Sequence, residues 1–345
     1  DMSFGVRGGT AALTRGFTDA GARGVRDGAF GVGWQWRWGV KVRAFADGTA
    51  SVVEPDGRQT VYWRNPDGSY TPGTYSLDTL SASGGGWRLV RRDQTALQFD
   101  GQGRLASETD HRGNQTSLAY AGSGGTPSQV SFPGGRALAI ADDANGHITR
   151  AQGPGGLQTS YTYDGAGNLL TATDAAGATT HYAYDVLHEL VTIVDANGHT
   201  VEYNLHSTDG HVTQQRDARG QTTSFGYAAD GPGGNVAPNT ATGPRGIQTQ
   251  YLFDGMGRLL SRVVVFNGAT VTQESWTYDA QGHVLSHTDG AGAVTAMTYD
   301  GAGNVLTQTV DPGGLDLKTT MTYDGQNDPL TVSYTHLRAH ETGRN

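Results

Sequence analysis

The stretch Tyr163–Asp185, YDGAGNLLTATDAAGATTHYAYD, contains the unit from which most of this chain is built. An aromatic–Asp pair opens the turn D-G-A-G, a strand-like segment follows, and a second turn, A-A-G, leads into ATTHYAYD. Asp precedes Gly by three residues in both turns, at Asp164 and Gly167 and again at Asp174 and Gly177. An Asp side chain stabilises a turn by accepting backbone hydrogen bonds, and Gly supplies a residue with positive φ. The stretch therefore predicts an antiparallel hairpin with strands of about six or seven residues.

The same unit recurs along the sequence with a period of about 21 residues, which indicates a repeat protein. Units begin in phase at Phe99, Tyr120, Tyr163, Tyr184, Tyr227, Phe253, Tyr278, Tyr299 and Tyr323. Asp142 and Leu205 keep the phase without an aromatic residue. The longer intervals contain insertions, such as residues 229–239 and 265–271. Because chance does not keep such a phase over most of the chain, we expect tandem β-hairpins.

The residues that we expect to carry the repeat are the aromatic–Asp pairs and the Asp and Gly residues of the turns. These structural positions are Tyr163, Asp164, Gly167, Asp174, Gly177, Tyr184, Asp185, Asp195, Gly198, Tyr278, Asp279, Gly282, Tyr299, Asp300 and Gly303. Turns are predicted at 164–167, 174–177, 185–188, 195–198, 279–282, 289–292 and 300–303. Tyr182 and Tyr184 share one strand face, so stacked hairpins predict ladders of equivalent tyrosines about 4.8 Å apart.

Composition agrees with many short strands and little helix. Gly occupies 53 of the 345 positions, about twice its usual share, and Asp greatly outnumbers the helix former Glu. The net charge of −9 argues against a nucleic-acid partner, because phosphate binding needs a basic surface. No apolar run is long enough to span a bilayer, and no signal peptide is visible. Cysteine is absent, which excludes disulfides and cysteine-based zinc sites.

This pattern resembles the YD repeats of RHS proteins, teneurins and the C component of insecticidal toxin complexes, over about residues 99–330. FGVGWQWRW at 30–38 is similar to the start of an RHS region, and 53–80 resembles its first hairpins. The resemblance implies an all-β fold in which tandem antiparallel hairpins form a curled, spiral sheet, part of a hollow cocoon-like shell. In bacterial members the shell commonly holds a variable C-terminal toxin until delivery. The excess of Arg over Lys indicates a bacterial source.

Three regions are expected from these patterns. Residues 1–98 form an N-terminal RHS-start region with the first hairpins, and residues 99–332 form the repeat array. Residues 333–345, SYTHLRAHETGRN, have no Asp–Gly turn in phase and resemble a translated sequencing adaptor. We expect this tail to be non-native or disordered. The closing core of the family and any toxin domain are expected to lie beyond this fragment.

Two acidic motifs suggest chemistry but have simpler explanations. The sequence DPGG at 311–314 resembles the self-cleavage motif of RHS core regions, yet its phase matches an ordinary second turn. The frequent Asp and Gly residues suggest calcium, but neither the nine-residue calcium β-roll period nor an EF-hand loop is present. We therefore predict no catalytic site, no metal site and no cofactor.

Histidine and tryptophan residues are also explained by structure. His147 and His283 follow the turn Gly, a place filled elsewhere by Asn168, Asn304, Arg104 or Arg258. His181, His199, His206 and His211 are scattered and lack metal-ligand spacing. Trp34, Trp36 and Trp38 alternate; burial against the first hairpins is favoured over a carbohydrate platform.

The leading functional hypothesis is a structural, non-enzymatic shell segment, secreted or at the cell surface, that encapsulates a C-terminal toxin of the same protein for interbacterial or host-directed delivery. A secretion machinery would be its other partner. The alternative is a secreted or surface repeat module that binds carbohydrate or wall polymers.

Overall fold

The computed structural model describes residues 2–6, 9–18, 28–73, 76–227, 239–325 and 327–335. In this part of the chain, regular structure consists of strands and two short 3-10 helices, η1 (Arg37–Gly39) and η2 (Pro154–Gly156). The predicted all-β fold is confirmed. No helix in the described residues is long and apolar enough to cross a bilayer. The insertion expected at 229–239 lies almost entirely outside the described residues, as does the predicted tail from residue 336 onward.

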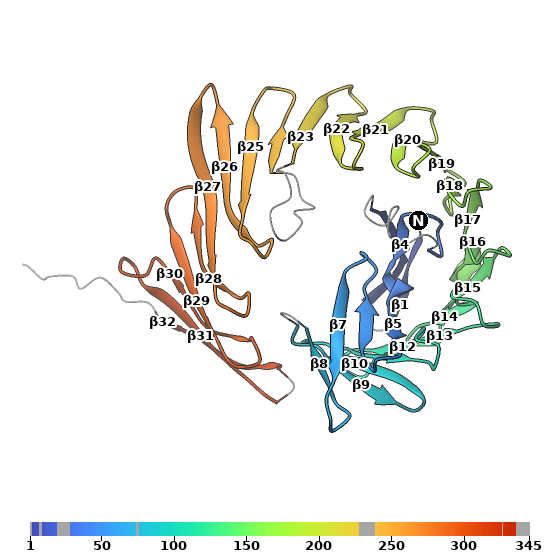
Figure 1. Cartoon of the computed structure of the whole chain (residues 1–345), viewed down its shortest axis with the longest axis horizontal. Coiled ribbons are helices and arrows are strands. Elements are labelled where there is room, and N and C mark those ends of the chain that lie inside the picture. Colours follow the sequence, from blue (N-terminus) through green and yellow to red (C-terminus); the bar gives the residue numbers. More distant parts are fainter. Residues whose placement is uncertain are drawn as a thin grey trace, which may run out of the picture. The chain divides into compact units, whose positions relative to one another are not determined.

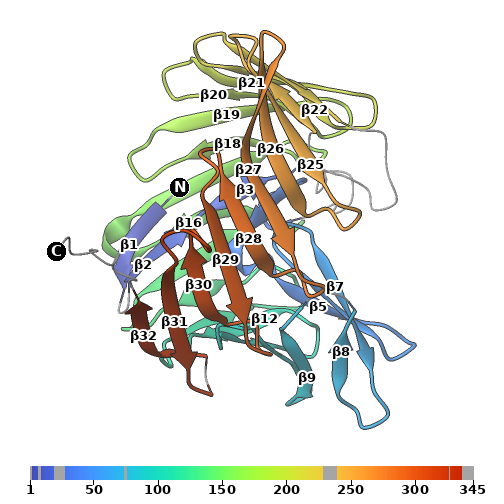
Figure 2. The same ribbon diagram turned by 90° about the vertical axis from the view of Figure 1, so that its left-hand side faces the viewer.

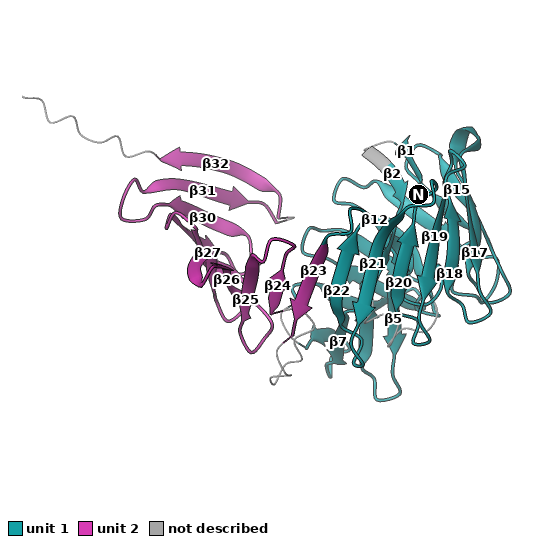
Figure 3. Ribbon diagram, turned by 90° about the horizontal axis from the view of Figure 1, so that it is seen from above, with its two compact units in different colours: residues 1–221 teal, residues 222–345 magenta. Residues whose placement is uncertain are grey.

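The chain divides into two compact units, residues 1–221 and 222–345, shown in Figure 3. We describe each unit by itself. The boundary between them falls inside the predicted repeat array. The sequence-based division at residues 98 and 332 stays a prediction about the repeat pattern.

The first unit begins with short sheets and continues as a long antiparallel array. The short sheets are β1–β2, β3–β4 and β5–β8. Their strands are β1 (Met2–Val6), β2 (Gly9–Leu13), β3 (Arg15–Phe17), β4 (Trp34–Trp36), β5 (Lys41–Ala44), β6 (Ala50–Val53), β7 (Gln59–Arg64) and β8 (Tyr70–Pro72). In the array each strand pairs antiparallel with the next. Its strands are β9 (Thr79–Ser83), β10 (Gly86–Val90), β11 (Ala96–Phe99), β12 (Leu105–Thr109), β13 (Gln115–Ala119), β14 (Gln129–Ser131), β15 (Ala137–Asp142), β16 (Ile148–Gln152), β17 (Gln158–Tyr163), β18 (Leu169–Thr173), β19 (Thr179–Tyr184), β20 (Leu190–Val194), β21 (Thr200–His206) and β22 (Val212–Asp217).

The second unit consists of the same kind of hairpin, with consecutive strands paired antiparallel. Figure 2 shows its later strands side by side in chain order. The strands are β23 (Thr222–Gly226), β24 (Thr240–Thr242), β25 (Gln248–Phe253), β26 (Leu259–Phe266), β27 (Ala269–Tyr278), β28 (Val284–Asp289), β29 (Val294–Tyr299), β30 (Val305–Val310), β31 (Leu317–Tyr323) and β32 (Pro329–Thr335).

All seven predicted turns are present. In each, the N–H of the fourth residue donates to the carbonyl of the first, over 3.0–3.2 Å. Gly fills the fourth place with φ between 79° and 89° in six of them. At 185–188 the fourth residue is His188, which has φ 67°. Its ring nitrogen Nδ1 lies 2.7 Å from Asn168 Oδ1, a contact that helps to hold a conformation disfavoured for a side-chain-bearing residue.

The hydrophobic core lies in the first unit. There the array packs around the N-terminal strands (Figure 1), and buried apolar side chains run from Met2 to Leu190. Among the described residues of the second unit, the apolar side chains are half-buried or exposed. The two units therefore share a repeat but differ in how its inner side chains are covered.

Candidate functional site

Several repeats share a three-residue contact that we name the turn clamp. It consists of the Asp that opens a first turn, the residue four positions later, and the aromatic residue that ends the next hairpin. In the clamp of Asp143, His147 and Tyr163, Asp143 Oδ1 accepts the backbone N–H of His147 over 2.9 Å. Its Oδ2 lies 3.3 Å from His147 Nδ1, and the imidazole stacks on the Tyr163 ring with centroids 4.7 Å apart. The Tyr163 hydroxyl donates to the Ile148 carbonyl over 2.7 Å, so the clamp joins two successive hairpins.

The same arrangement is built with different middle residues. Arg104 and Arg258 place the guanidinium 4.2 and 4.8 Å from the rings of Tyr120 and Tyr278. His283 stacks on Tyr299 at 4.6 Å. In each case the middle side chain also donates to Oδ2 of the turn Asp, as Asn168 and Asn304 do at 2.8 and 2.9 Å. In these five clamps the middle residue is a planar donor. The sequence-based interpretation of this position as a variable turn exit missed that shared property.

The electrostatics of the clamp favour charged Asp and neutral Tyr. Burial raises the pKa of Tyr120 to about 12, against the opposing charge of Arg104, and it also raises the pKa of Tyr163. These hydroxyls thus remain donors at neutral pH. Burial acts to raise the pKa of Asp164, but hydrogen bonds from the side chain and backbone of Asn168 outweigh it and lower that pKa below its usual value. The clamp is a structural contact rather than an acid–base pair.

The predicted tyrosine ladder is wrong in its spacing. Each repeat contributes two strands, so equivalent tyrosines lie on every second strand, about 9–10 Å apart rather than 4.8 Å. Tyr163 and Tyr299 each stack on the middle residue of their own clamp, which is His147 or His283.

In the first unit, the segment 28–42 lies along the first turns of the array and covers its inner face. Ile148 donates its N–H to Ala29, Val32 to Gly167, and Val42 to Gly103, over 2.7–3.0 Å. The Gly103 position has no space for a side chain, because an added Cβ would lie 1.9 Å from the Val42 carbonyl oxygen.

Aromatic side chains of this segment complete the cover. Trp34 meets the Tyr182 ring edge-on at 5.1 Å and donates its Nε1–H to the Tyr184 hydroxyl over 2.7 Å. Phe30 contacts the Tyr161 ring at 5.0 Å. Trp34, Trp36 and Trp38 are all buried, as predicted, but Trp34 and Trp38 contact Tyr182 and Phe132 of the array rather than the first hairpins. They do not form an exposed carbohydrate platform.

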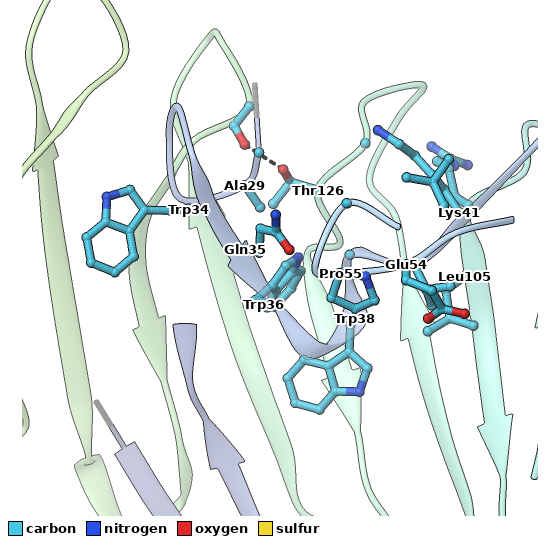
Figure 4. A pocket seen from close by; sticks show the side chains of 18 of the residues that line it. Ala29, Trp34, Gln35, Trp36, Trp38, Lys41, Glu54, Pro55, Leu105 and Thr126 are labelled. Atoms are coloured by element: carbon cyan, nitrogen blue, oxygen red, sulfur yellow. Dashed lines mark hydrogen bonds between the residues drawn. The ribbon is translucent and has the colours of Figure 1, made fainter. Parts of the chain in front are cut away.

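A small pocket lies between this segment and the array of the same unit. Its volume is about 220 Å³, and its lining includes Trp36, Trp38, Lys41, Glu54 and Thr126 (Figure 4). Small-molecule sites usually measure roughly 300–1,000 Å³, so this space suits at most a compact ligand.

The remaining sequence-predicted positions lie in the turns. Asp174, Asp195 and Asp300 each accept two backbone N–H groups at one carboxylate oxygen, over 2.8–2.9 Å. Gly177, Gly198, Gly282 and Gly303 have positive φ. The turn at 311–314 differs from other second turns: Asp311 itself has φ 54°, and its Oδ2 accepts the Leu315 N–H over 2.8 Å.

One clamp departs from the pattern and brings together three ionisable side chains. Asp185, Glu189 and His206 each place a ligand-type atom within 4.8 Å of the others. The sequence phase placed Leu205 at the aromatic position. A β-bulge at Ile193/Val194 adds one residue to β21, so His206 takes that place and pairs with Val212.

Comparisons with known proteins find RHS repeats in two parts of the chain. The sequence profile of the RHS Repeat family matches residues 143–179, 164–200 and 278–316. Curated proteins gave no significant match. Among solved structures, the TcdB2–TccC3 crystal structure is 14% identical with a TM-score of 0.49, over 85% of this chain and 18% of that one. A Tc holotoxin pore of Photorhabdus luminescens with a mutated TccC3 is 13% identical with a TM-score of 0.36, over 94% of this chain and 22% of that one. This chain thus spans about a fifth of the length of those structures. From its profile matches, the chain contains RHS repeats at residues 143–200 and 278–316.

Proposed function

We propose that this chain is a wall segment of a hollow RHS shell that encloses a toxin domain of the same full-length protein for delivery to another cell. The observation that supports it most is the uncovered inner face of the second unit. Tyr251, Trp276, Met297 and Met321 occupy the position two residues before the clamp aromatic, and all four are half-buried. In the first unit the equivalent residues are covered, so a further segment, such as the proposed toxin domain, would be needed to cover those of the second.

The turn clamps support a structural role. They connect each hairpin to the next through backbone and ring contacts, so the sheet is stabilised locally along its length. A wall of this kind does not depend on a packed centre, which leaves room for cargo. We propose that such a shell is secreted or displayed at the cell surface.

Limited proteolysis of the full-length gene product, including its proposed toxin domain, tests the proposal. We expect the toxin domain to survive protease while the shell is folded and to be digested after the shell is opened by urea. The same domain expressed alone provides the control and should be digested at once. Equal digestion of the fused and isolated domain would contradict encapsulation.

The alternative function, binding of carbohydrate or wall polymers, needs exposed aromatic side chains. Burial of Trp34, Trp36 and Trp38 removes the strongest candidates for that surface. A pull-down of the chain on insoluble cell-wall polymer distinguishes the two functions, because a shell wall should not be retained.

A further inference from the structure

The clamp of Asp185, Glu189 and His206 has the geometry of its neighbours but different chemistry. Asp185 Oδ1 accepts the N–H groups of Leu187 and Glu189 over 2.8 and 3.0 Å, as in ordinary clamps. Glu189 then stands in the place of Asn168 or His283, and His206 in the place of a tyrosine. This clamp therefore keeps the backbone hydrogen bonds of the turn, but its middle residue and its aromatic residue are replaced by Glu189 and His206.

The replacement brings two carboxylates together. In the neighbouring clamp, Asn168 donates to Asp164 Oδ2 over 2.8 Å. An ionised Glu189 is acceptor-only and cannot donate to Asp185 in this way. The imidazole of His206 approaches from the next hairpin, with Nδ1 3.8 Å from Glu189 Oε2. Three atoms of metal-ligand type thus converge on one point.

Burial makes this convergence significant. Glu189 is 1% exposed, and the side chain of His206 is 5% exposed. A cation coordinated by these side chains would offset the cost of holding an ionised carboxylate such as that of Glu189 out of water. The frame around them is fixed, because Asn204 donates Nδ2–H to the Leu190 carbonyl over 3.2 Å. That carbonyl is the equivalent of the one to which clamp tyrosines donate.

We propose that Asp185, Glu189 and His206 bind a divalent transition-metal ion, with Zn²⁺ as the best match. Zinc accepts imidazole nitrogen and carboxylate oxygen at about 2.0–2.2 Å, usually with four ligands. Calcium prefers six to eight oxygen atoms, which this compact site does not offer. Tetrahedral coordination needs ligand atoms about 3.4 Å apart, so the separations between the three atoms, now within 4.8 Å, would shorten by up to about 1.4 Å. The ion would connect the β19–β20 turn to the end of β21, replacing the stacking contact of an ordinary clamp. This proposal revises the sequence-based prediction that the chain has no metal site.

Zinc titration of the 345-residue chain, produced without a histidine tag and treated with EDTA, tests the site. Calorimetry should detect one Zn²⁺ per chain, and the thermal unfolding midpoint should rise by several degrees with Zn²⁺. The decisive variant is Glu189→Asn combined with His206→Tyr, which recreates the clamp of Asp164, Asn168 and Tyr184. It should fold, lose the thermal response to Zn²⁺, and bind the ion at least about tenfold more weakly. His283→Asn is the matched control and should keep the full response.

The possible outcomes separate the alternatives. A response that is lost in the double variant and kept in the control supports the proposal. An equal response in the parent chain and the double variant would place the ion elsewhere and overturn it. Absence of any response in the parent chain would also overturn it, leaving a buried contact between His206 and the two carboxylates. A larger response to Ca²⁺ than to Zn²⁺ would contradict the assigned class of metal.

Discussion

Tyr161 in β17 and Trp276 in β27 occupy the same position of the repeat but lie in different surroundings. Tyr161 is buried beneath Phe30, whereas Trp276 is half-buried and stacks on His287 at 5.2 Å. Their turns and clamps follow the same pattern. The two units therefore show that the hairpin is specified locally, while burial of its inner face depends on a separate segment that covers it.

This difference separates two sources of stability. Turn hydrogen bonds and clamp contacts recur in both units, so they do not require a packed centre. The core of the first unit depends on residues 28–42, which lie far in sequence from the strands they cover. We expect the second unit to be the less stable of the two in this chain.

The largest expected effect is the loss of a covered aromatic residue. Tyr161→Ala should lower the free energy of unfolding by about 3–5 kcal/mol, because it removes a buried ring. Trp276→Ala should cost less than half as much, since its side chain is already partly in water. Urea unfolding followed separately in each unit measures both. An equal cost for the two variants would show that the inner faces are equally covered.

A second pair of substitutions tests the cover through the backbone. Gly103 and Gly257 occupy the same turn position, with φ of 76° and 78°, and each precedes an Arg. Gly257→Ala should cost about 1–2 kcal/mol from backbone strain alone. Gly103→Ala should cost at least about 2 kcal/mol more, because its Cβ displaces the Val42 carbonyl. Urea midpoints give the comparison, and similar values would argue against close packing of segment 28–42.

A smaller effect is expected at the middle residue of a clamp. His283→Asn should cost less than about 1 kcal/mol, because Asn can still donate to Asp279, as Asn304 does to Asp300. His283→Ala should cost more, since it loses both that hydrogen bond and the stacking on Tyr299. Urea unfolding of the two variants and the parent chain measures both losses of stability. If Ala is tolerated as well as Asn, the clamp contributes nothing measurable.

The smallest effect concerns the carboxylate of a single turn. Hydrogen bonds from the Arg258 backbone and side chain lower the pKa of Asp254 below its usual value. The ionised Asp254 carboxylate therefore stabilises the folded state above about pH 4. This stabilisation is lost as the pH falls through the pKa of Asp254 in the folded state. We expect the urea midpoint to fall as the pH is lowered from about 4 to about 2, and slightly less steeply in Asp254→Asn. An identical slope in both proteins would contradict a stabilising role for that charge.

Local structure could be predicted well from the sequence, whereas contacts between distant parts of the chain could not. The spacing of Asp164 and Gly167 predicts a turn because both residues act within four positions. The clamp was missed because its middle residue varies among Arg, His and Asn, whose shared property is a planar donor. The shift from Leu205 to His206 depends on a β-bulge, which the repeat phase does not reveal. The cover by segment 28–42 could not be predicted, because its partners lie more than 60 residues away in sequence.

Native-state hydrogen exchange, read by mass spectrometry on the intact chain, tests the central claim most directly. It compares strands of equivalent repeat position, β17 and β19 in the first unit with β29 and β31 in the second. The account predicts that amides of β17 and β19 exchange much more slowly, because segment 28–42 must detach before those strands open. Equal protection in the two pairs, or slower exchange in β29 and β31, would contradict it.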